Sequence, residues 1–193
     1  KELSKKGHTM IPVFDFNTAS RKEELIPLSL SDSEVLIIEG IHGLNPVMTK
    51  GISEELVYKI YISALTTINI DSHNRFATTD TRLIRRLTRD YEYRNSSASR
   101  TLNMWESVRS GEDKYIFPFQ EQADVIFNSA LMYEHGLLRV FAEPILKKVK
   151  KDDPAYDEAK RLLDILSAFE KIDSSAVPPS SIIREFIGGS CFH

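Results

Sequence analysis

The sequence is poor in groups that stabilise secreted, membrane-bound or metal-binding proteins. Cys191 is the only cysteine, so no disulfide can form within the chain, and we expect a cytoplasmic location. The five histidines show no metal-ligand spacing and no His-x-x-x-His pair. No apolar run approaches the roughly 20 residues that a membrane-spanning helix needs, so we expect no membrane partner.

Charge and length narrow the class of protein further. The chain has 25 basic and 28 acidic residues, and this net charge of −3 argues against a nucleic-acid partner. Hydrophobic residues at 41% and charged residues at 27% are ordinary for a soluble globular domain. The 193 residues suffice for one domain with a full core. Because the sequence begins at Lys1 without methionine, we expect it to be part of a longer protein.

The stretch 35–43, VLIIEGIHG, is the strongest local pattern. Four consecutive apolar residues predict a strand that is buried on both faces, as in a parallel sheet covered by helices. Glu39 is then the first polar side chain beyond the carboxyl end of that strand, where open α/β sheets bind their ligands. Such a carboxylate can hold a magnesium–nucleotide or orient an attacking group. The alternative is a strand that ends in a surface glutamate.

Strand-like and helix-like segments alternate along the rest of the chain. This alternation predicts an α/β fold with a mostly parallel sheet, flanking helices and additional helices at the C-terminus. We expect segment 95–99 to be a polar, mobile lid, and segment 110–119 to be irregular. The expected strands are 11–16, 24–30, 57–63 and 123–128, and the expected helices are 78–93, 101–108, 134–150, 154–172 and 181–187.

A ladder of arginines is the sharpest chemical signal. Spacings of three and four residues place the four guanidinium groups along one side of the helix 78–93, and Arg94 extends the basic run. Arginine binds phosphate in bidentate fashion, and several such groups can offset the charge on a transferring phosphoryl group. The alternative is a solvated helix face paired with nearby acids. The ladder consists of Arg82, Arg85, Arg86 and Arg89.

Four dispersed segments together resemble the uridine kinase/phosphoribulokinase family of P-loop kinases. They are IPVFDFNTASRKE at 11–23, VLIIEG at 35–40, DTRLIRRLTRD at 80–90 and ADVIF at 123–127. The segments SALTTINIDSHNR and IIREFIGGS resemble, more narrowly, a bacterial subgroup of uridine kinase-like proteins. In that subgroup the kinase domain follows a threonyl-tRNA-synthetase-like region.

The resemblance implies a P-loop NTPase-like domain that uses ATP and Mg²⁺ to phosphorylate a hydroxyl of a nucleoside or sugar. Residues 1–150 would be the C-terminal portion of that kinase domain, with 151–193 as a helical extension packed on it. Glu39 matches the acidic residue near magnesium and the reacting hydroxyl, and the arginine ladder matches the basic catalytic helix. The residues expected to bind substrate are Phe14, Asp15, Phe16 and Arg21 of a hairpin, together with Arg94, the first arginine of the lid.

The sequence departs from the family pattern at three places. The phosphate-binding loop, Gly-x-x-x-x-Gly-Lys-Ser/Thr, is absent, so we expect it to precede Lys1 and this chain alone to be a poor catalyst. Phe14 and Ala19 replace a tyrosine and a histidine that contact the pyrimidine in uridine kinases, which weakens the case for uridine. Ser96 replaces a second lid arginine. The alternative function is a non-catalytic nucleotide- or RNA-related binding module, and homo-oligomerisation is left open.

Overall fold

The computed structural model describes every residue except 1, 16–19, 70, 74 and 193. The chain forms two compact units, and each is described by itself below. The first unit comprises Lys1–Ile60 together with Tyr115–Asp124, and the second comprises Tyr61–Lys114 together with Val125–His193.

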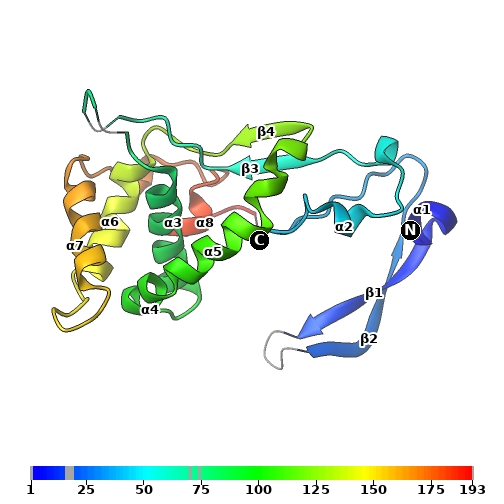
Figure 1. Cartoon of the computed structure of the whole chain (residues 1–193), viewed down its shortest axis with the longest axis horizontal. Coiled ribbons are helices and arrows are strands. Elements are labelled where there is room, and N and C mark those ends of the chain that lie inside the picture. The colour runs from blue at the N-terminus through cyan, green and yellow to red at the C-terminus, as the bar shows by residue number, and fades with distance from the viewer. Residues whose placement is uncertain (1, 16–19, 70, 74, 193) are drawn as a thin grey trace. The chain divides into compact units, whose positions relative to one another are not determined.

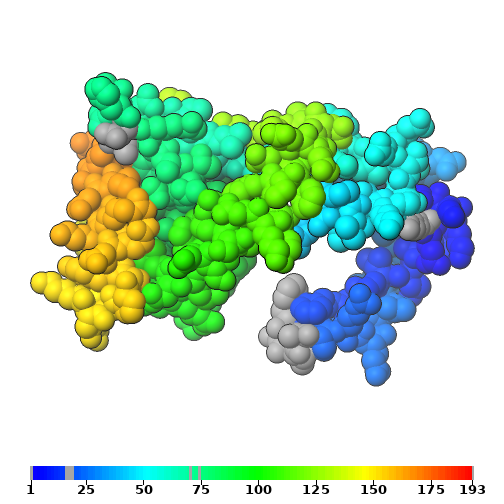
Figure 2. All heavy atoms as spheres, in the orientation of Figure 1, coloured from blue at the N-terminus to red at the C-terminus, as the bar shows by residue number. Residues whose placement is uncertain are grey.

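The first unit is built on an antiparallel hairpin. Strand β1 (His8–Asp15) pairs with β2 (Ser20–Ser29), and the register is irregular between Pro12 and Phe14. Proline lacks the N–H that a central strand must donate, which suits a ribbon of only two strands. Figure 2 shows the atoms of these two strands in blue. The unit also contains the short helices α1 (Glu2–Lys6), α2 (Pro46–Thr49), η1 (Glu54–Leu56) and η2 (Phe117–Gln122).

The prediction of a buried strand at 35–38 is wrong. Residues 34–40 have no regular secondary structure, and the side chains of Val35, Ile37 and Ile38 are 87%, 88% and 78% exposed. A strand of a parallel sheet needs a neighbouring strand for its hydrogen bonds and a helix to cover its face. Within the described part of the chain no strand pairs with this segment, so its apolar sequence does not form one.

The second unit carries a two-stranded parallel sheet beside a group of helices. Strand β3 (Ile60–Ser63) pairs with β4 (Val125–Asn128), and Ser129 N donates to Ser63 O at 2.8 Å where the pair ends. The Asn128 side chain adds a further link, because its Oδ1 accepts from Leu65 N at 2.9 Å. Figure 1 shows the two strands side by side.

The helices of this unit pack around α3 (Thr78–Tyr93), the helix that carries the arginine ladder. Leu83, Ile84 and Leu87 of α3 are at most 1% exposed, and they join the core with leucines of α6 and α7. Figure 1 shows α6 next to α3, and α7 next to α6. The other helices are α4 (Ala98–Asn103), α5 (Trp105–Tyr115), α6 (Glu134–Leu146), α7 (Tyr156–Ser167), η3 (Ser174–Ala176) and α8 (Arg184–Ile187).

The predicted α/β class, with a parallel sheet, flanking helices and C-terminal helices, is confirmed. Local boundaries differ from the predictions at several places. The helix predicted at 101–108 is divided at Met104 between α4 and α5, and the segment expected to be irregular after Ser110 stays helical to Tyr115. Among the residues that the structure describes, no helix combines the length and the apolar character needed to cross a membrane.

Candidate functional site

Most faces of helix α3 are buried, and one narrow face carries partly exposed arginines. The side chains of Arg82, Arg86 and Arg89 are 27%, 26% and 25% exposed. Because these positions are four and three residues apart, they form a single stripe along the helix. The buried positions cover the remaining faces and are Thr81, Leu83, Ile84, Arg85, Leu87, Thr88 and Asp90.

Asp90 is the anchor for the C-terminal half of this stripe. Its carboxylate accepts from Arg89 Nε at 3.2 Å and from Arg89 Nη2 at 3.1 Å. Arg94 Nη1 lies 3.3 Å from Asp90 Oδ1, and Arg86 Nε lies 3.2 Å from Oδ2. Since three guanidinium groups share one carboxylate, the cluster keeps an excess of positive charge.

Glu112 of α5 has a similar role at the other end of the stripe. This residue is 6% exposed, and its carboxylate accepts from the side chains of Arg82 and Arg109. The distance from Arg109 Nη1 to Glu112 Oε2 is 3.2 Å. Helix α5 therefore fixes the orientation of Arg82 from outside α3, and sequence spacing alone does not reveal this contact.

Arg85 differs from its neighbours because its guanidinium is buried. Arg85 Nε donates to Glu134 Oε2 at 2.6 Å, and Arg85 Nη2 donates to the Ser129 carbonyl at 2.7 Å. The guanidinium carbon also lies 5.1 Å from the centre of the Phe186 ring, which is a cation–π distance. Arg85 thus joins α3 to the turn before α6 and to α8, and it contributes to the framework of the site.

Two buried polar residues at the start of α6 were missed by the sequence analysis. Glu134 is fully buried; burial raises the pKa of its carboxyl, and the charge of Arg85 opposes that rise. The neighbouring His135 is also fully buried, and its Nε2 lies 2.9 Å from Thr81 Oγ1. Burial, with a smaller contribution from Arg85, lowers the pKa of His135 to about 4, so the imidazole is neutral at pH 7. The one sequence feature that could have drawn attention to Glu134 and His135 is their position shortly after strand β4.

The predicted lid segment is fixed by hydrogen bonds on both sides. Ser96 N donates to the Asp90 carbonyl at 3.0 Å, and Ser97 caps α4 by accepting from Arg100 N. Ser99 Oγ donates to the carboxylate of Asp153, and this bond is the main reason that the pKa of Asp153 is lowered. The segment therefore holds a defined turn in the structure, with Arg94 57% exposed at its start.

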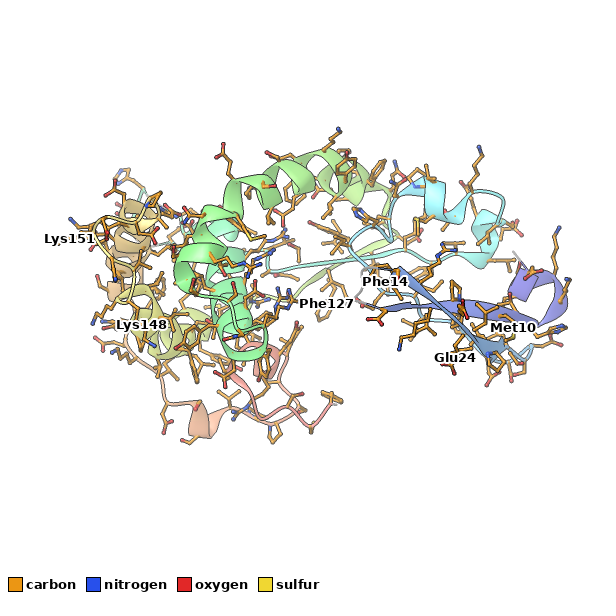
Figure 3. The ribbon with its side chains drawn as sticks, turned by 90° about the horizontal axis from the view of Figure 1, so that it is seen from below. Met10, Phe14, Glu24, Phe127, Lys148 and Lys151 are labelled. Atoms are coloured by element: carbon orange, nitrogen blue, oxygen red, sulfur yellow. The ribbon has the colours of Figure 1, made fainter. Side chains whose placement is uncertain are left out.

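The hairpin residues of the predicted substrate site lie in the first unit. Phe14 is opposite Arg21 in the strand register, and Asp15 is opposite Ser20. Figure 3 shows Phe14 toward the loop end of the hairpin and Met10 closer to α1. Phe16 and Ala19 lie outside the described residues.

Glu39 also belongs to the first unit, in the irregular segment 34–40, and it is exposed. The arginines of α3 belong to the second unit. In the described ranges no group of three or more His, Cys, Asp or Glu side chains could hold a metal ion by itself. A single exposed carboxylate nevertheless suits a nucleotide-bound Mg²⁺ ion, because phosphate oxygens and water molecules supply the other ligands of the ion.

Comparison with known proteins finds relatives that are named uridine kinases. The chain is 34% identical over 117 residues to uridine-cytidine kinase B of Dictyostelium discoideum, a match that covers 60% of this chain and 41% of that protein. It is 28% identical over 127 residues to a uridine kinase of Staphylococcus aureus strain JH9, covering 65% of this chain and 53% of that protein. The chain spans about half the length of the curated relatives it matches.

The sequence profile of the phosphoribulokinase/uridine kinase family matches residues 1–133. The match includes the hairpin, Glu39, the whole of α3 and β4, and it ends just before α6. A match of this extent, more than half of the chain, shows the family. The chain belongs to the phosphoribulokinase/uridine kinase family.

Proposed function

We propose that the protein containing this chain transfers the γ-phosphoryl group of ATP to a hydroxyl group of a nucleoside or sugar. The observation that carries the proposal is the stripe formed by Arg82, Arg86 and Arg89. These arginines lie within the family match, on the one face of α3 that the core does not cover. Family membership and the names of the relatives support a phosphotransferase, and the identity of the acceptor is part of the proposal.

The stripe would stabilise the negative charge of the phosphate groups. In phosphoryl transfer the protein contributes chiefly by positioning groups and by stabilising the charge on the transferred phosphoryl. Because Asp90 and Glu112 already hold the guanidinium groups, little reorganisation is needed when a phosphate arrives. We assign Arg82, Arg86 and Arg89 to the phosphates and Arg94 to the substrate side. Arg85 we assign to positioning, because its guanidinium is buried against Glu134.

Glu39 is the residue that would hold Mg²⁺, directly or through a water molecule. Its exposed carboxylate fits a cation that keeps most of its ligands from phosphate and water. When bound, Mg²⁺ would neutralise charge on the phosphate oxygens of ATP. The sequence carries no Gly-x-x-x-x-Gly-Lys-Ser/Thr loop, so residues 1–193 alone should turn over ATP poorly.

The hairpin would bind the acceptor. The cross-strand pair Phe14 and Arg21, with Asp15 beside it, offers an aromatic ring, a cation and a carboxylate. Phe14 cannot donate the hydrogen bond that a tyrosine would, and a site that lacks such a contact discriminates poorly for a base edge. We therefore favour a hydroxylated acceptor other than uridine.

The test uses the complete natural polypeptide that contains this sequence, with Mg-ATP and a panel of nucleosides and sugars. We expect substrate-dependent ADP release that collapses in Glu39→Gln and falls roughly 10²- to 10³-fold in Arg86→Gln. Arg100→Gln is the matched control, because Arg100 is an exposed arginine on α4 outside the stripe. Turnover that is unchanged in both Glu39→Gln and Arg86→Gln would overturn the assignment.

A second candidate is a non-catalytic module that binds a nucleotide or an RNA-related ligand. The altered hairpin residue Phe14 favours it. Tight ATP binding without turnover on any hydroxyl compound would support this candidate over the kinase.

A further inference from the structure

A pocket of about 570 Å³ lies in the second unit, between the C-terminal end of α3 and the segment 180–192. This volume falls in the range of roughly 300–1,000 Å³ that is usual for small-molecule sites. The C-terminal segment lies beyond residues 1–133, the part of the chain that the family profile matches. The lining residues used below are Arg89, Tyr93, Arg94, Ser180, Arg184 and Phe192.

The charge of the pocket favours an anion. Three arginines and one acid, Glu185, line it. Arg89 and Arg94 share the carboxylate of Asp90 with Arg86, and Arg89 Nη1 also lies 4.0 Å from Glu185 Oε1. Two carboxylates thus face the three guanidinium groups of Arg86, Arg89 and Arg94, and part of the positive charge remains. Arginine and serine side chains, which occur together here, are common donors to phosphate oxygens.

The C-terminal wall of the pocket is held in place by its own contacts. Arg184 donates to the carbonyls of Ser174 at 2.8 Å and Gly188 at 3.2 Å. Ile183 is fully buried in the core, and Cys191 N donates to the Pro179 carbonyl at 3.0 Å. A wall fixed in this way loses little conformational entropy when a ligand binds.

The turn at the end of α8 fits closely against α3. Gly188 has φ +85°, a left-handed conformation that favours glycine, and a Cβ there would lie 3.1 Å from the Tyr93 hydroxyl. Phe192 is 72% exposed and Tyr93 is 55% exposed, so two aromatic rings border the arginines. The pocket thus combines excess positive charge with surfaces on which a planar group could stack.

We propose that this pocket binds the polyphosphate group of a ligand and that the segment 180–192 is part of the binding site. The proposal rests on the proposed function because Arg89 and Arg94 are assigned there to phosphate and substrate. It adds Arg184, Ser180 and the aromatic border, which lie outside the catalytic stripe. The ligand is a nucleotide or a free polyphosphate, and the two share the chemistry that the arginines would recognise.

Cys191 provides a local reporter for the test. It is exposed and lies between Ser190 and Phe192, two residues of the pocket wall. In the natural polypeptide, the alkylation rate of Cys191 is measured by mass spectrometry of its peptide during titration with sodium pyrophosphate or ATP. We expect saturable protection, because a bound anion would cover the segment that carries Cys191. Tighter protection by ATP would identify a nucleotide site, and equal protection a polyphosphate site.

Matched variants separate the pocket from general charge effects. Arg94→Gln removes a cation from the pocket, and Ser180→Asp adds an anion to its wall. Each should raise about tenfold the concentration of pyrophosphate or ATP that gives half-maximal protection of Cys191, because one charge-assisted contact is lost. Arg100→Gln and Ser107→Asp make the same changes at exposed helical positions that do not line the pocket. They should change this half-protecting concentration less than about twofold.

The proposal is overturned if neither pyrophosphate nor ATP protects Cys191, or if Arg94→Gln and Ser180→Asp are protected as well as the wild type. This outcome is distinct from failure of the proposed function. ATP turnover without protection of Cys191 would overturn the pocket alone. Protection of Cys191 without turnover would support the pocket and overturn the phosphotransferase reaction.

Discussion

The guanidinium of Arg85 and the carboxylate of Glu134 meet inside the second unit, with Nε donating to Oε2 at 2.6 Å. Both side chains are almost without solvent, at 8% and 0% exposure. Glu134 Oε1 also accepts from Leu131 N at 3.0 Å, and Arg85 donates to Ser129, so each charge is satisfied by several partners. The pair links the arginine helix to the turn that follows the parallel sheet.

Breaking this pair should strongly destabilise the protein. Glu134→Ala leaves the buried cation of Arg85 without its partner, and we expect the free energy of unfolding to fall by about 3–5 kcal/mol. The double variant Arg85→Met with Glu134→Leu should cost less than the sum of the two single changes, since it leaves no buried charge. Urea denaturation measures both. A double variant as costly as that sum would contradict the buried-pair account.

The neutral, buried His135 should make stability depend on pH. Its pKa is about 4 in the folded protein against 6.5 as the ordinary value, so the unfolded chain binds more protons between these values. The contribution of His135 to the free energy of unfolding is therefore fully present above about pH 6.5, and it is lost as the pH falls toward 4. The shift sets a limit of about 3 kcal/mol on the loss.

The measurement compares urea unfolding of the wild type with that of His135→Phe between pH 7 and 4. The wild type should lose more stability on acidification than the variant, because phenylalanine does not titrate. Glu134 must be kept in both proteins: its raised pKa adds stability at low pH and lessens the slope equally in each. Parallel pH curves would show that His135 is not the source.

Asp90 should be needed to keep three arginines together. Asp90→Asn removes the negative charge between Arg86, Arg89 and Arg94, and we expect a loss of about 1–3 kcal/mol in the free energy of unfolding. Salt screens repulsion between exposed guanidinium groups, so the loss should be smaller at about 0.5 M NaCl than at about 20 mM. Glu92→Gln, an exposed change on the same helix, is the control. A loss that does not depend on salt would argue against repulsion as its cause.

Much of the second unit could be predicted from local periodicity. Helix α3 covers the segment in which the sequence predicts a helix, and β4 lies within the predicted segment 123–128. The arginine spacing correctly groups Arg82, Arg86 and Arg89, but it also places Arg85 in the same ladder. It does not show that Arg85, one position away from the stripe, is buried, because that depends on Glu134, 49 residues later in the sequence.

The segment 35–43 shows where a sequence pattern alone predicts the wrong structure. Its apolar pattern is that of a buried strand, but Val35 and Ile37 are exposed and the segment is irregular. A pattern states which surroundings a segment would suit, and it does not supply the neighbouring strands. Likewise, Glu112 resembles an ordinary surface acid in the sequence, and only the packing of α3 and α5 identifies it as an anchor for Arg82. Asp90, in contrast, lies four residues from both Arg86 and Arg94, a spacing that the sequence itself shows.

Two helical glycines should respond in opposite ways to alanine. At Gly136 in α6, an added Cβ would lie 2.3 Å from the Glu170 carbonyl oxygen, a clash with backbone that cannot move aside easily. We expect Gly136→Ala to cost about 1–3 kcal/mol despite alanine's better helix propensity. At Gly111 in α5 nothing lies within 4 Å, so Gly111→Ala should stabilise the protein by about 0.5–1 kcal/mol. Thermal unfolding of the two variants side by side tests this. A stabilised Gly136→Ala variant would mean that α6 and the segment around Glu170 are not packed as closely as the structure shows.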